Sequence, residues 1–356
     1  MKAWRLAGLG GELCFADVPK PEPRPGSALV RIEASLVLSY LKPYVEGKLP
    51  MYNPPPGAFT IGTDGVGTVE AIGREVWGVR PGQRVVISPR FFPRENVAEP
   101  PEVLIGLTSI SPGAEPVLAD WPDGTFAEYA LLPVEAITPA EGLDQVSAAQ
   151  LAVLGRCIVP FGGLLRGRLA VGETLIVIGA TGAYGGAAVL LGLALGAARV
   201  VAAGRNPTKL AAVARACGPR VSPVPLTGDV QADANALRAA SNGGAEMAFD
   251  MVGQARDSNA TLAALRSLRR GGRLVLMGSM SVELPVSYTV IMLNSLEILG
   301  QYMYPVSAYG RLLGLLRSGQ LDLSPIQPRV YPLPALREAM DAAAVAGNLE
   351  CVVVQA

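Results

Sequence analysis

Histidine is absent from this chain of 356 residues. Imidazole is a common catalytic base and metal ligand, so its absence excludes Ser-His and Cys-His catalysis and any metal site built on histidine. Cysteine is scarce as well, and Cys14, Cys157, Cys217 and Cys351 lie too far apart to form a CxxC pair. This spacing predicts scattered buried thiols rather than a disulfide framework or a cysteine-rich zinc site. We therefore expect chemistry that uses other groups.

The net charge is zero, since 30 basic residues balance 30 acidic ones. Only 17% of the chain is charged. This gives no electrostatic reason to expect a nucleic-acid partner or an anionic membrane. The start, MKAWRLAGLGGEL, lacks the apolar run of a signal peptide. The uncharged stretch 174–198 could cross a bilayer by length, but its central glycines predict a buried strand, a turn and a core helix. We expect a soluble, cytoplasmic protein of two domains.

The chain divides into two parts that differ in the pattern of their apolar residues. Up to about residue 138, short apolar runs alternate with loops imposed by proline and glycine, which predicts a β-rich domain. Within it, segment 89–124 has seven prolines and no clear period, as is typical of a functional lid or a partly disordered loop. From about Ser147, short apolar strands alternate with helices, which predicts a doubly wound α/β sheet. We read 258–270 as a helix, 284–305 as strands, 308–318 and 335–346 as helices and 351–354 as a strand.

Residues 174–186, TLIVIGATGAYGG, combine a strand, a glycine turn and a helix start. Glycine keeps such a turn tight and lets a pyrophosphate approach the backbone amides at a helix N-terminus. A second strand follows within a βαβ unit, which is the context in which a glycine motif indicates a dinucleotide site. The residues expected to contact the cofactor are Gly179, Ala180, Thr181, Gly182, Ala183, Tyr184, Gly185, Gly204, Arg205, Asn206, Lys209, Val252, Gly253 and Gly278.

The end of the second strand indicates which cofactor binds. NAD-binding units place an acid there to hold the ribose 2′-hydroxyl. Here the strand ends in Gly204, Arg205 and Asn206, Lys209 follows one turn later, and no acid is near. A guanidinium in this place can hydrogen-bond a 2′-phosphate as a charged fork. The sequence therefore favours NADP(H).

Several motifs together resemble the medium-chain dehydrogenase/reductase superfamily, especially its zinc-less quinone-oxidoreductase-like branch. They cover nearly the whole chain: IGTDGVGTVEAIG at 61–73, VRPGQRV at 79–85, DGTFAEYALLP at 123–133, the glycine turn, FDMVG at 249–253 and GGRLVLMG at 271–278. The resemblance implies a GroES-like partial barrel (1–138), a doubly wound Rossmann domain for NADP(H) (139–305) and a C-terminal segment that returns to the barrel (306–356). It also implies a nicotinamide bound in the cleft between domains.

The chain departs from the zinc enzymes of this superfamily at the positions that bind metal. Where they carry Gly-His-Glu, this sequence has Gly62, Thr63 and Asp64, and Leu38 stands at their first cysteine ligand. Cys157 is near the third ligand but out of register. The lobe that holds a structural zinc in those enzymes corresponds to 89–124, which contains no cysteine. We therefore predict that no metal is bound.

Without zinc, a conjugated enone or a quinone is easier to reduce than a simple ketone, because charge spreads into an enolate or a hydroquinone anion. Such a site needs hydrogen-bond donors and a proton source. By alignment Tyr40 falls at the hydroxyl of the proton relay of zinc relatives, with Tyr44 and Tyr52 close by. These tyrosines are the candidate donors, and Asp64 is a further candidate that could instead order its turn. Arg90 and Arg94 could gate an acidic substrate or simply face solvent.

The function expected is an NADPH-dependent, metal-independent reductase of an enone or a quinone. Two alternatives stay open. One is a zinc-independent carbonyl or imine reductase, or alcohol dehydrogenase, on the same scaffold. The other is a protein that binds NADPH without catalysis and serves as a redox-linked interaction partner. Relatives pair edge strands near 284–305 into dimers, so a homodimer is expected.

Overall fold

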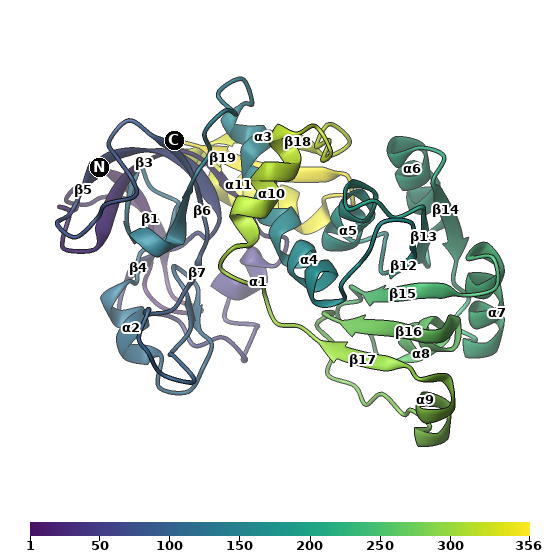
Figure 1. Cartoon of the computed structure of the whole chain (residues 1–356). Coiled ribbons are helices and arrows are strands. Elements are labelled where there is room, and N and C mark those ends of the chain that lie inside the picture. Colours follow the sequence, from purple (N-terminus) through teal and green to yellow (C-terminus); the bar gives the residue numbers. More distant parts are fainter. The chain divides into compact units, whose positions relative to one another are not determined.

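The computed structural model describes residues 1–356, which form two units (Figure 1). The first unit comprises residues 1–155, 328–346 and 351–356, and the second comprises residues 156–327 and 347–350. The first unit thus extends to Gly155 rather than to the predicted residue 138. Residues 306–327 belong to the second unit instead of returning to the barrel with the rest of the C-terminal segment.

Helix α10 (Ala308–Arg317) explains why this segment stays with the second unit. Leu312 and Leu313 are fully buried, and the Arg311 guanidinium lies 5.9 Å from the centre of the Phe161 ring. Burial of two leucines contributes about 3–6 kcal/mol, which fixes the helix to this unit.

The first unit is built on mainly antiparallel strands around β3 (Ser27–Leu36). The sheet that contains β3 has the order β11-β6-β5-β3-β19-β18, and β10 also pairs with β3. A second sheet has the order β2-β1-β4. The strands of these sheets are β1 (Lys2–Leu6), β2 (Leu13–Asp17), β4 (Phe59–Thr60), β5 (Gly65–Ile72), β6 (Arg84–Ile87), β10 (Tyr129–Pro133), β11 (Ile137–Pro139), β18 (Gln327–Pro332) and β19 (Glu350–Gln355). The GroES-like β-rich architecture expected from the sequence is confirmed.

Three helices accompany these strands: α1 (Leu41–Val45), α3 (Ala148–Ala152) and α11 (Leu336–Val345). The core beneath the barrel strands is made of valine, isoleucine, leucine and alanine side chains, as strands with one buried face require. Helix α11 ends at the position that the sequence predicts to within one residue.

Segment 89–124 contains regular secondary structure, which differs from the alternative of a partly disordered loop. It folds as a small sheet of β7 (Arg90–Phe91), β8 (Val103–Leu104) and β9 (Thr108–Ser109), followed by helix α2 (Glu115–Asp120). Strands of two residues are too short to show a hydrophobic period in the sequence.

The second unit contains a six-stranded parallel sheet of order β14-β13-β12-β15-β16-β17 (Figure 1). Counted along the chain, this is the order 3-2-1-4-5-6 of a doubly wound nucleotide-binding sheet, so the predicted α/β fold is confirmed. The strands are β12 (Thr174–Ile178), β13 (Arg199–Gly204), β14 (Val221–Pro225), β15 (Ala245–Asp250), β16 (Leu268–Leu276) and β17 (Glu297–Gly300). The central residues of β12, β13 and β15 are fully buried, as strands covered on both faces must be, whereas the edge strands β14 and β17 are more exposed.

Helices connect these strands: α4 (Leu154–Arg166), α5 (Ala183–Ala194), α6 (Pro207–Cys217), α7 (Val230–Ala240), α8 (Asn259–Arg266) and α9 (Tyr288–Asn294). Two predictions were wrong here. The helix predicted over 258–270 ends at Arg266, because the chain enters β16 at Leu268. Segment 284–305 contains helix α9 as well as strand β17, because the Ser287 hydroxyl caps the helix by accepting from the Val290 amide at 3.4 Å.

Helices α3 and α4 together form the run Ala148–Arg166, which is long and apolar enough to cross a membrane. Of its most apolar window, 83% is buried inside the protein. A core helix passes the same test of length and composition, and burial of this degree is what a core helix shows.

Candidate functional site

The glycine turn lies between β12 and α5, in the strand, turn and helix context that the sequence predicts. Gly179 has φ = 77°, and a Cβ at this residue would lie 2.9 Å from the carbonyl oxygen of Met251. A Cβ at Gly185 would lie 2.0 Å from the carbonyl oxygen of Gly179. Neither position has room for a side chain, so the backbone of the turn is bare. No side chain caps the N-terminus of α5, which leaves its first amides to an anion.

A cavity of about 610 Å³ opens beside this turn, within the second unit. Its wall is formed by the residues that follow four neighbouring strands, β12, β13, β14 and β15. The strand order reverses between β12 and β15, and doubly wound sheets bind dinucleotides at that point. The position and the volume of the cavity fit a nucleotide.

Two aspartates and two arginines line the cavity. Asp233 is buried, and its carboxylate accepts hydrogen bonds from the Thr227 amide and hydroxyl, both at 2.8 Å, and from the Gly228 amide at 2.9 Å. Asp257 accepts a hydrogen bond from the Asn259 amide at 3.0 Å.

The arginines differ from the aspartates in having no partner. Arg205 and Arg256 are exposed, and neither guanidinium forms a hydrogen bond or an ion pair with the rest of the protein. The carboxylates of the cavity are therefore engaged, while both guanidinium groups remain available to an anion.

Asp250, at the end of β15, was missed by sequence reasoning although it belongs to the motif FDMVG. It is 1% exposed, and its carboxylate accepts from the Val252 amide at 2.8 Å and from the Thr261 hydroxyl at 2.5 Å. Burial raises the pKa of Asp250, and these two hydrogen bonds oppose the rise. Asp250 thereby fixes the loop after β15, against which the backbone of Gly179 packs.

Half of the fourteen predicted cofactor residues line the cavity: Gly179, Thr181, Gly182, Gly204, Arg205, Val252 and Gly253. The others do not: Ala180, Ala183, Tyr184, Gly185, Asn206, Lys209 and Gly278. Asn206 instead caps α6, since its side-chain oxygen accepts from the Lys209 amide at 3.0 Å. Gly278 allows close packing, because a Cβ there would lie 2.1 Å from the Val252 carbonyl oxygen.

The first unit brings Tyr40, Tyr44 and Tyr52 together, and we call these three residues the tyrosine cluster. The Tyr44 ring meets the Tyr52 ring edge-on at 5.3 Å between centroids, and the Tyr40 and Tyr52 centroids are 6.0 Å apart. Tyr40 and Tyr52 are half-buried. Tyr44 is fully buried, and its hydroxyl donates to the carbonyl oxygen of Leu107.

The environment of the cluster favours neutral phenols. Burial raises the pKa of Tyr44 well above its ordinary value and also raises the pKa of Tyr52, although the neighbouring Tyr40 side chain partly opposes the rise at Tyr52. Both hydroxyls therefore keep their protons at neutral pH and can act as hydrogen-bond donors.

The turn of Gly62, Thr63 and Asp64 lies next to the end of β3, because the Leu36 amide donates to the Asp64 carbonyl oxygen at 3.1 Å. Thr63 and Asp64 are buried, and the Thr63 hydroxyl has no hydrogen-bond partner in the protein. Gly155 packs against Asp64, since a Cβ at Gly155 would lie 2.5 Å from the Asp64 Cβ.

The residues at this turn do not fit a zinc ion. Leu38 and Thr63 supply no nitrogen or thiolate, and residues 1–356 contain no group of three His, Cys, Asp or Glu side chains arranged to hold a metal. All four cysteines are free thiols.

Arg90 does not face solvent, contrary to one interpretation of the sequence. Its guanidinium is half-buried and forms a two-pronged ion pair with Glu102, from Nε to Oε1 at 2.6 Å and from Nη2 to Oε2 at 3.0 Å. Arg94 is exposed, and its Nε lies 4.0 Å from Oε1 of Glu135. The Arg90 guanidinium is therefore engaged within the protein, which argues against Arg90 as a gate for an acidic substrate.

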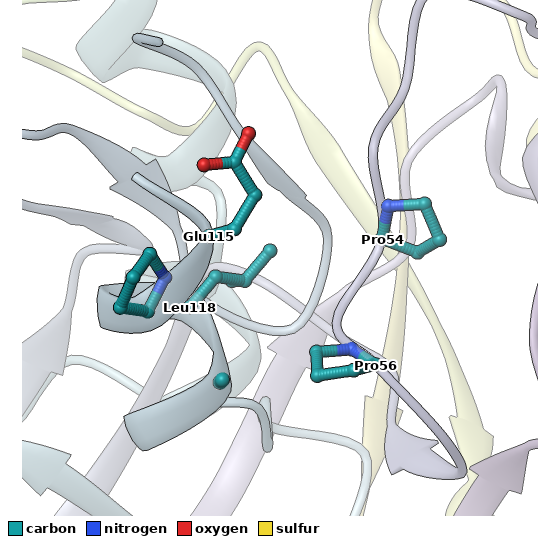
Figure 2. Close-up of a pocket in the computed structure, with 6 residues that line it drawn as sticks. Pro54, Pro56, Glu115 and Leu118 are labelled. Carbon is teal, nitrogen blue, oxygen red and sulfur yellow. The ribbon is translucent and has the colours of Figure 1, made fainter. Parts of the chain in front are cut away.

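A shallow pocket of about 350 Å³ separates the proline loop 53–57 from helix α2. Figure 2 shows Pro54 and Pro56 on one side of it, facing Glu115 and Leu118 on the other. With one carboxylate and otherwise apolar walls, this pocket offers no set of catalytic groups. It does show that segment 89–124 borders the loop that follows Tyr52.

Comparison with known proteins places the two units in recognised families. Residues 24–142 match the alcohol dehydrogenase GroES-like domain, and residues 183–318 match the zinc-binding dehydrogenase family. An NAD-dependent alcohol dehydrogenase of Sulfurisphaera tokodaii is 26% identical over 96% of both chains. A sorbitol dehydrogenase of Bacillus subtilis is 24% identical over 96% of this chain and 93% of its own.

Solved structures share the fold over the whole chain. A zinc-binding dehydrogenase of Sinorhizobium meliloti, with NADP bound in its crystal structure, covers 100% of this chain and 99% of its own at a TM-score of 0.79 and 20% identity. The relatives named here are alcohol, polyol and zinc-binding dehydrogenases rather than quinone reductases. The comparisons thus support a nicotinamide-dependent oxidoreductase and do not confirm the zinc-less branch or a preference for NADP.

Proposed function

The chain belongs to the medium-chain dehydrogenase/reductase superfamily, and from this premise we propose that it is a metal-independent, NADP(H)-dependent reductase of enones or quinones. That it is an NAD(P)-dependent oxidoreductase follows from its two family domains. The observation that carries the finer proposal is the turn at Thr63 and Asp64. It is buried and well packed, yet it and Leu38 offer none of the ligands that a catalytic zinc needs.

Without a Lewis acid, the protein has to stabilise developing negative charge with hydrogen bonds. Reduced nicotinamide supplies a hydride when it is bound. Conjugation in the substrate spreads the resulting charge onto an oxygen, and a phenol can donate a proton to that oxygen. This requirement matches the tyrosine cluster, in which burial raises the pKa of Tyr44 and of Tyr52.

Within the cluster we assign different roles. Tyr40 is the proposed donor to the substrate, with the ring of Tyr52 beside it at 6.0 Å between centroids. Tyr44 is a positioning residue, because its hydroxyl proton is used by the Leu107 carbonyl oxygen. Asp64 is a second positioning residue, since its side chain is buried against Gly155 and its carbonyl oxygen holds the end of β3.

The preference for NADP(H) rests on Arg205, with no acid following β13 in the sequence, and on the further guanidinium of Arg256 in the same cavity. A 2′-phosphate carries about two charges near neutral pH and can engage both. The groups proposed to hold the pyrophosphate are the backbone amides of the first turn of α5.

A second candidate function is that of an alcohol or polyol dehydrogenase working in the direction of carbonyl reduction without zinc. The printed activities of the relatives favour it. It would require the tyrosine cluster to polarise an unconjugated carbonyl unaided, which is a harder task for neutral hydrogen-bond donors.

We also propose a homodimer formed through the second unit. Seven of the chain's thirteen exposed large apolar residues lie between residues 286 and 306, and helix α9 buries none of its residues. Strand β17 is the edge of its sheet, so its outer backbone groups are free to pair with a second copy. The cytoplasmic location expected from the sequence stays a prediction.

Initial rates of NADPH oxidation by chelator-treated protein test the function. The substrates are an enone, its saturated ketone, a quinone and a cyclic imine, each repeated with NADH. Turnover of the enone or the quinone with a preference for NADPH supports the proposal. Turnover restricted to the saturated ketone or the imine would favour the second candidate. One equivalent of tightly bound zinc, measured by elemental analysis, would contradict metal independence.

A further inference from the structure

The hairpin of β8 and β9, residues 102–111, meets every segment of the proposed catalytic site in the first unit. We propose that this hairpin positions the tyrosine cluster, and that the ion pair between Arg90 and Glu102 holds the hairpin where zinc relatives are expected to use a structural metal. The inference rests on the proposed function only for the catalytic role of the cluster. The positioning itself can be measured without activity.

Glu102 holds the base of the hairpin with every polar group it has. Its amide donates to the Ser111 hydroxyl at 2.7 Å, and its carbonyl oxygen accepts from the Ile110 and Ser111 amides at 2.9 and 3.3 Å. Its carboxylate binds Arg90 through both oxygens, with only 16% and 19% of the two side chains exposed. A two-pronged ion pair sheltered from water is the geometry in which such a pair gives directional strength.

Arg90 connects this base to the rest of the lobe. It pairs with Leu104 across β7 and β8, and the Ile105 amide donates to the Pro89 carbonyl oxygen at 2.8 Å. The stretch has no cysteine and the structure shows no donor set for a metal. The residues present therefore do not fit a structural zinc, and the ion pair is the cross-link that they form instead.

The tip of the hairpin contacts the site at three places. The Leu107 carbonyl oxygen accepts the hydroxyl proton of Tyr44 at 2.5 Å. The Thr108 hydroxyl accepts from the Asn53 amide at 2.9 Å, and the Ser109 amide donates to the Asn53 carbonyl oxygen at 2.9 Å, which fixes the residue next to Tyr52.

The third contact is backbone on backbone. Gly106 has φ = 72°, and a Cβ there would lie 2.3 Å from the Gly62 carbonyl oxygen. The hairpin tip is thus packed directly onto the turn that carries Thr63 and Asp64. Helix α2, which follows the hairpin, lines the pocket opposite Pro54 and Pro56 in Figure 2.

Four consecutive residues, 106–109, therefore position three separate segments of the proposed catalytic site. A displacement of about 1 Å at a reacting group can cost on the order of a hundredfold in rate. Loosening the hairpin should accordingly slow the chemical step more than it weakens cofactor binding, which belongs to the other unit.

Glu102→Gln tests the inference, and Glu33→Gln is its matched control. Glu33 forms an ion pair of similar burial with Arg84 in the same unit, but away from the hairpin. We expect Glu102→Gln to lower kcat for the enone or quinone about tenfold while KM for NADPH changes less than about twofold. Glu33→Gln should leave kcat near the wild-type value. Gly106→Ala, which disturbs the tip without touching the ion pair, should reproduce the kcat effect.

Hydrogen exchange provides the readout that does not depend on activity. In Glu102→Gln we expect faster exchange in residues 102–111 and also in 40–53, with Glu33→Gln showing neither. Faster exchange in 102–111 alone, with 40–53 protected and kcat unchanged, would overturn the inference. If the wild-type protein reduces no enone or quinone, the proposed function fails. The exchange at 40–53 then still upholds or refutes positioning by the hairpin.

Discussion

The hydroxyl of Tyr44 donates a hydrogen bond of 2.5 Å to the carbonyl oxygen of Leu107, 63 residues along the chain. A phenol has a single proton to donate, so this bond removes Tyr44 from the residues that could donate to a substrate. The sequence offers three tyrosines as candidate donors, with Tyr40 foremost by alignment, and this one contact sets Tyr44 apart from the other two as a positioning residue.

Replacing Tyr40 by phenylalanine tests the proposed donor. We expect kcat to fall about 10²-fold, in line with the usual contribution of general acid catalysis, and KM for NADPH to stay unchanged. Steady-state kinetics with the best enone or quinone measure this. Tyr129→Phe is a suitable control, since Tyr129 lies half-buried in β10 and has no assigned role in the site. Wild-type turnover by Tyr40→Phe would remove Tyr40 from the mechanism.

Alkaline pH should destabilise the protein through Tyr44. Burial raises its pKa above the value of 10.0 that applies in the unfolded chain. A group with a raised pKa contributes stability that is complete below the unfolded pKa and is lost as pH rises towards the folded pKa. The wild-type Tm should therefore fall above about pH 10, and Tyr44→Phe should show a smaller decline. Parallel declines in thermal scans between pH 8 and 11 would argue against this origin.

Arg205→Ala and Arg256→Ala test the cofactor preference. Each should raise KM for NADPH about ten- to hundredfold, because a charge-assisted contact to the 2′-phosphate contributes about 1.5–3 kcal/mol. KM for NADH should change little. Arg215→Ala, an exposed arginine in the last turn of α6, is the control. Equal losses with both cofactors would mean that these arginines contact the adenosine rather than its phosphate.

Asp250→Ala should lower the free energy of unfolding by about 2–3 kcal/mol, because it leaves the Val252 amide and the buried Thr261 hydroxyl without a partner. The loop after β15 should loosen, and KM for the nicotinamide cofactor should rise. Urea unfolding and kinetics together measure both effects. An unchanged unfolding midpoint would show that Asp250 does not hold the loop.

Leu293→Glu tests the proposed dimer. Leu293 is 61% exposed on α9, so a charge there costs the monomer little but would be unfavourable inside an apolar interface. We expect analytical ultracentrifugation to show a monomer for this variant and a dimer for the wild type. Val171→Glu, which is 85% exposed on the same unit, should leave the assembly intact. A wild-type monomer would refute the proposal directly.

The parts that the sequence predicts well are those determined by local chemistry. The glycine turn requires residues without a Cβ, so Gly179 and Gly185 reveal it. The buried strands of the parallel sheet reveal themselves by continuous apolar runs. In both cases the constraint acts on neighbouring residues, and the spacing in the sequence records it.

The parts that escaped prediction depend on packing between distant segments. Arg256 and Asp233 share a cavity because the segments before α8 and at the start of α7 meet, as the hydrogen bond from the Asn259 side chain to the Gly228 carbonyl oxygen shows. The hairpin at 102–111 consists of two-residue strands held by Glu102, and no periodicity could reveal them. Helix α9 resembles a strand in the sequence because its apolar residues have no polar face to reveal the helical period.

The chain's route through its two units has a consequence for how the protein can be made. Residues 347–350 belong to the second unit, where the Asn348 side chain donates to the Ala180 carbonyl oxygen at 3.4 Å, while Val353 pairs with Leu36 in the first. During synthesis, β3 emerges from the ribosome early, but β19 can pair with it only after almost the entire chain has been made. Neither unit is a contiguous stretch that could be excised or exchanged as a cassette, and folding of both is completed by the same short C-terminal segment.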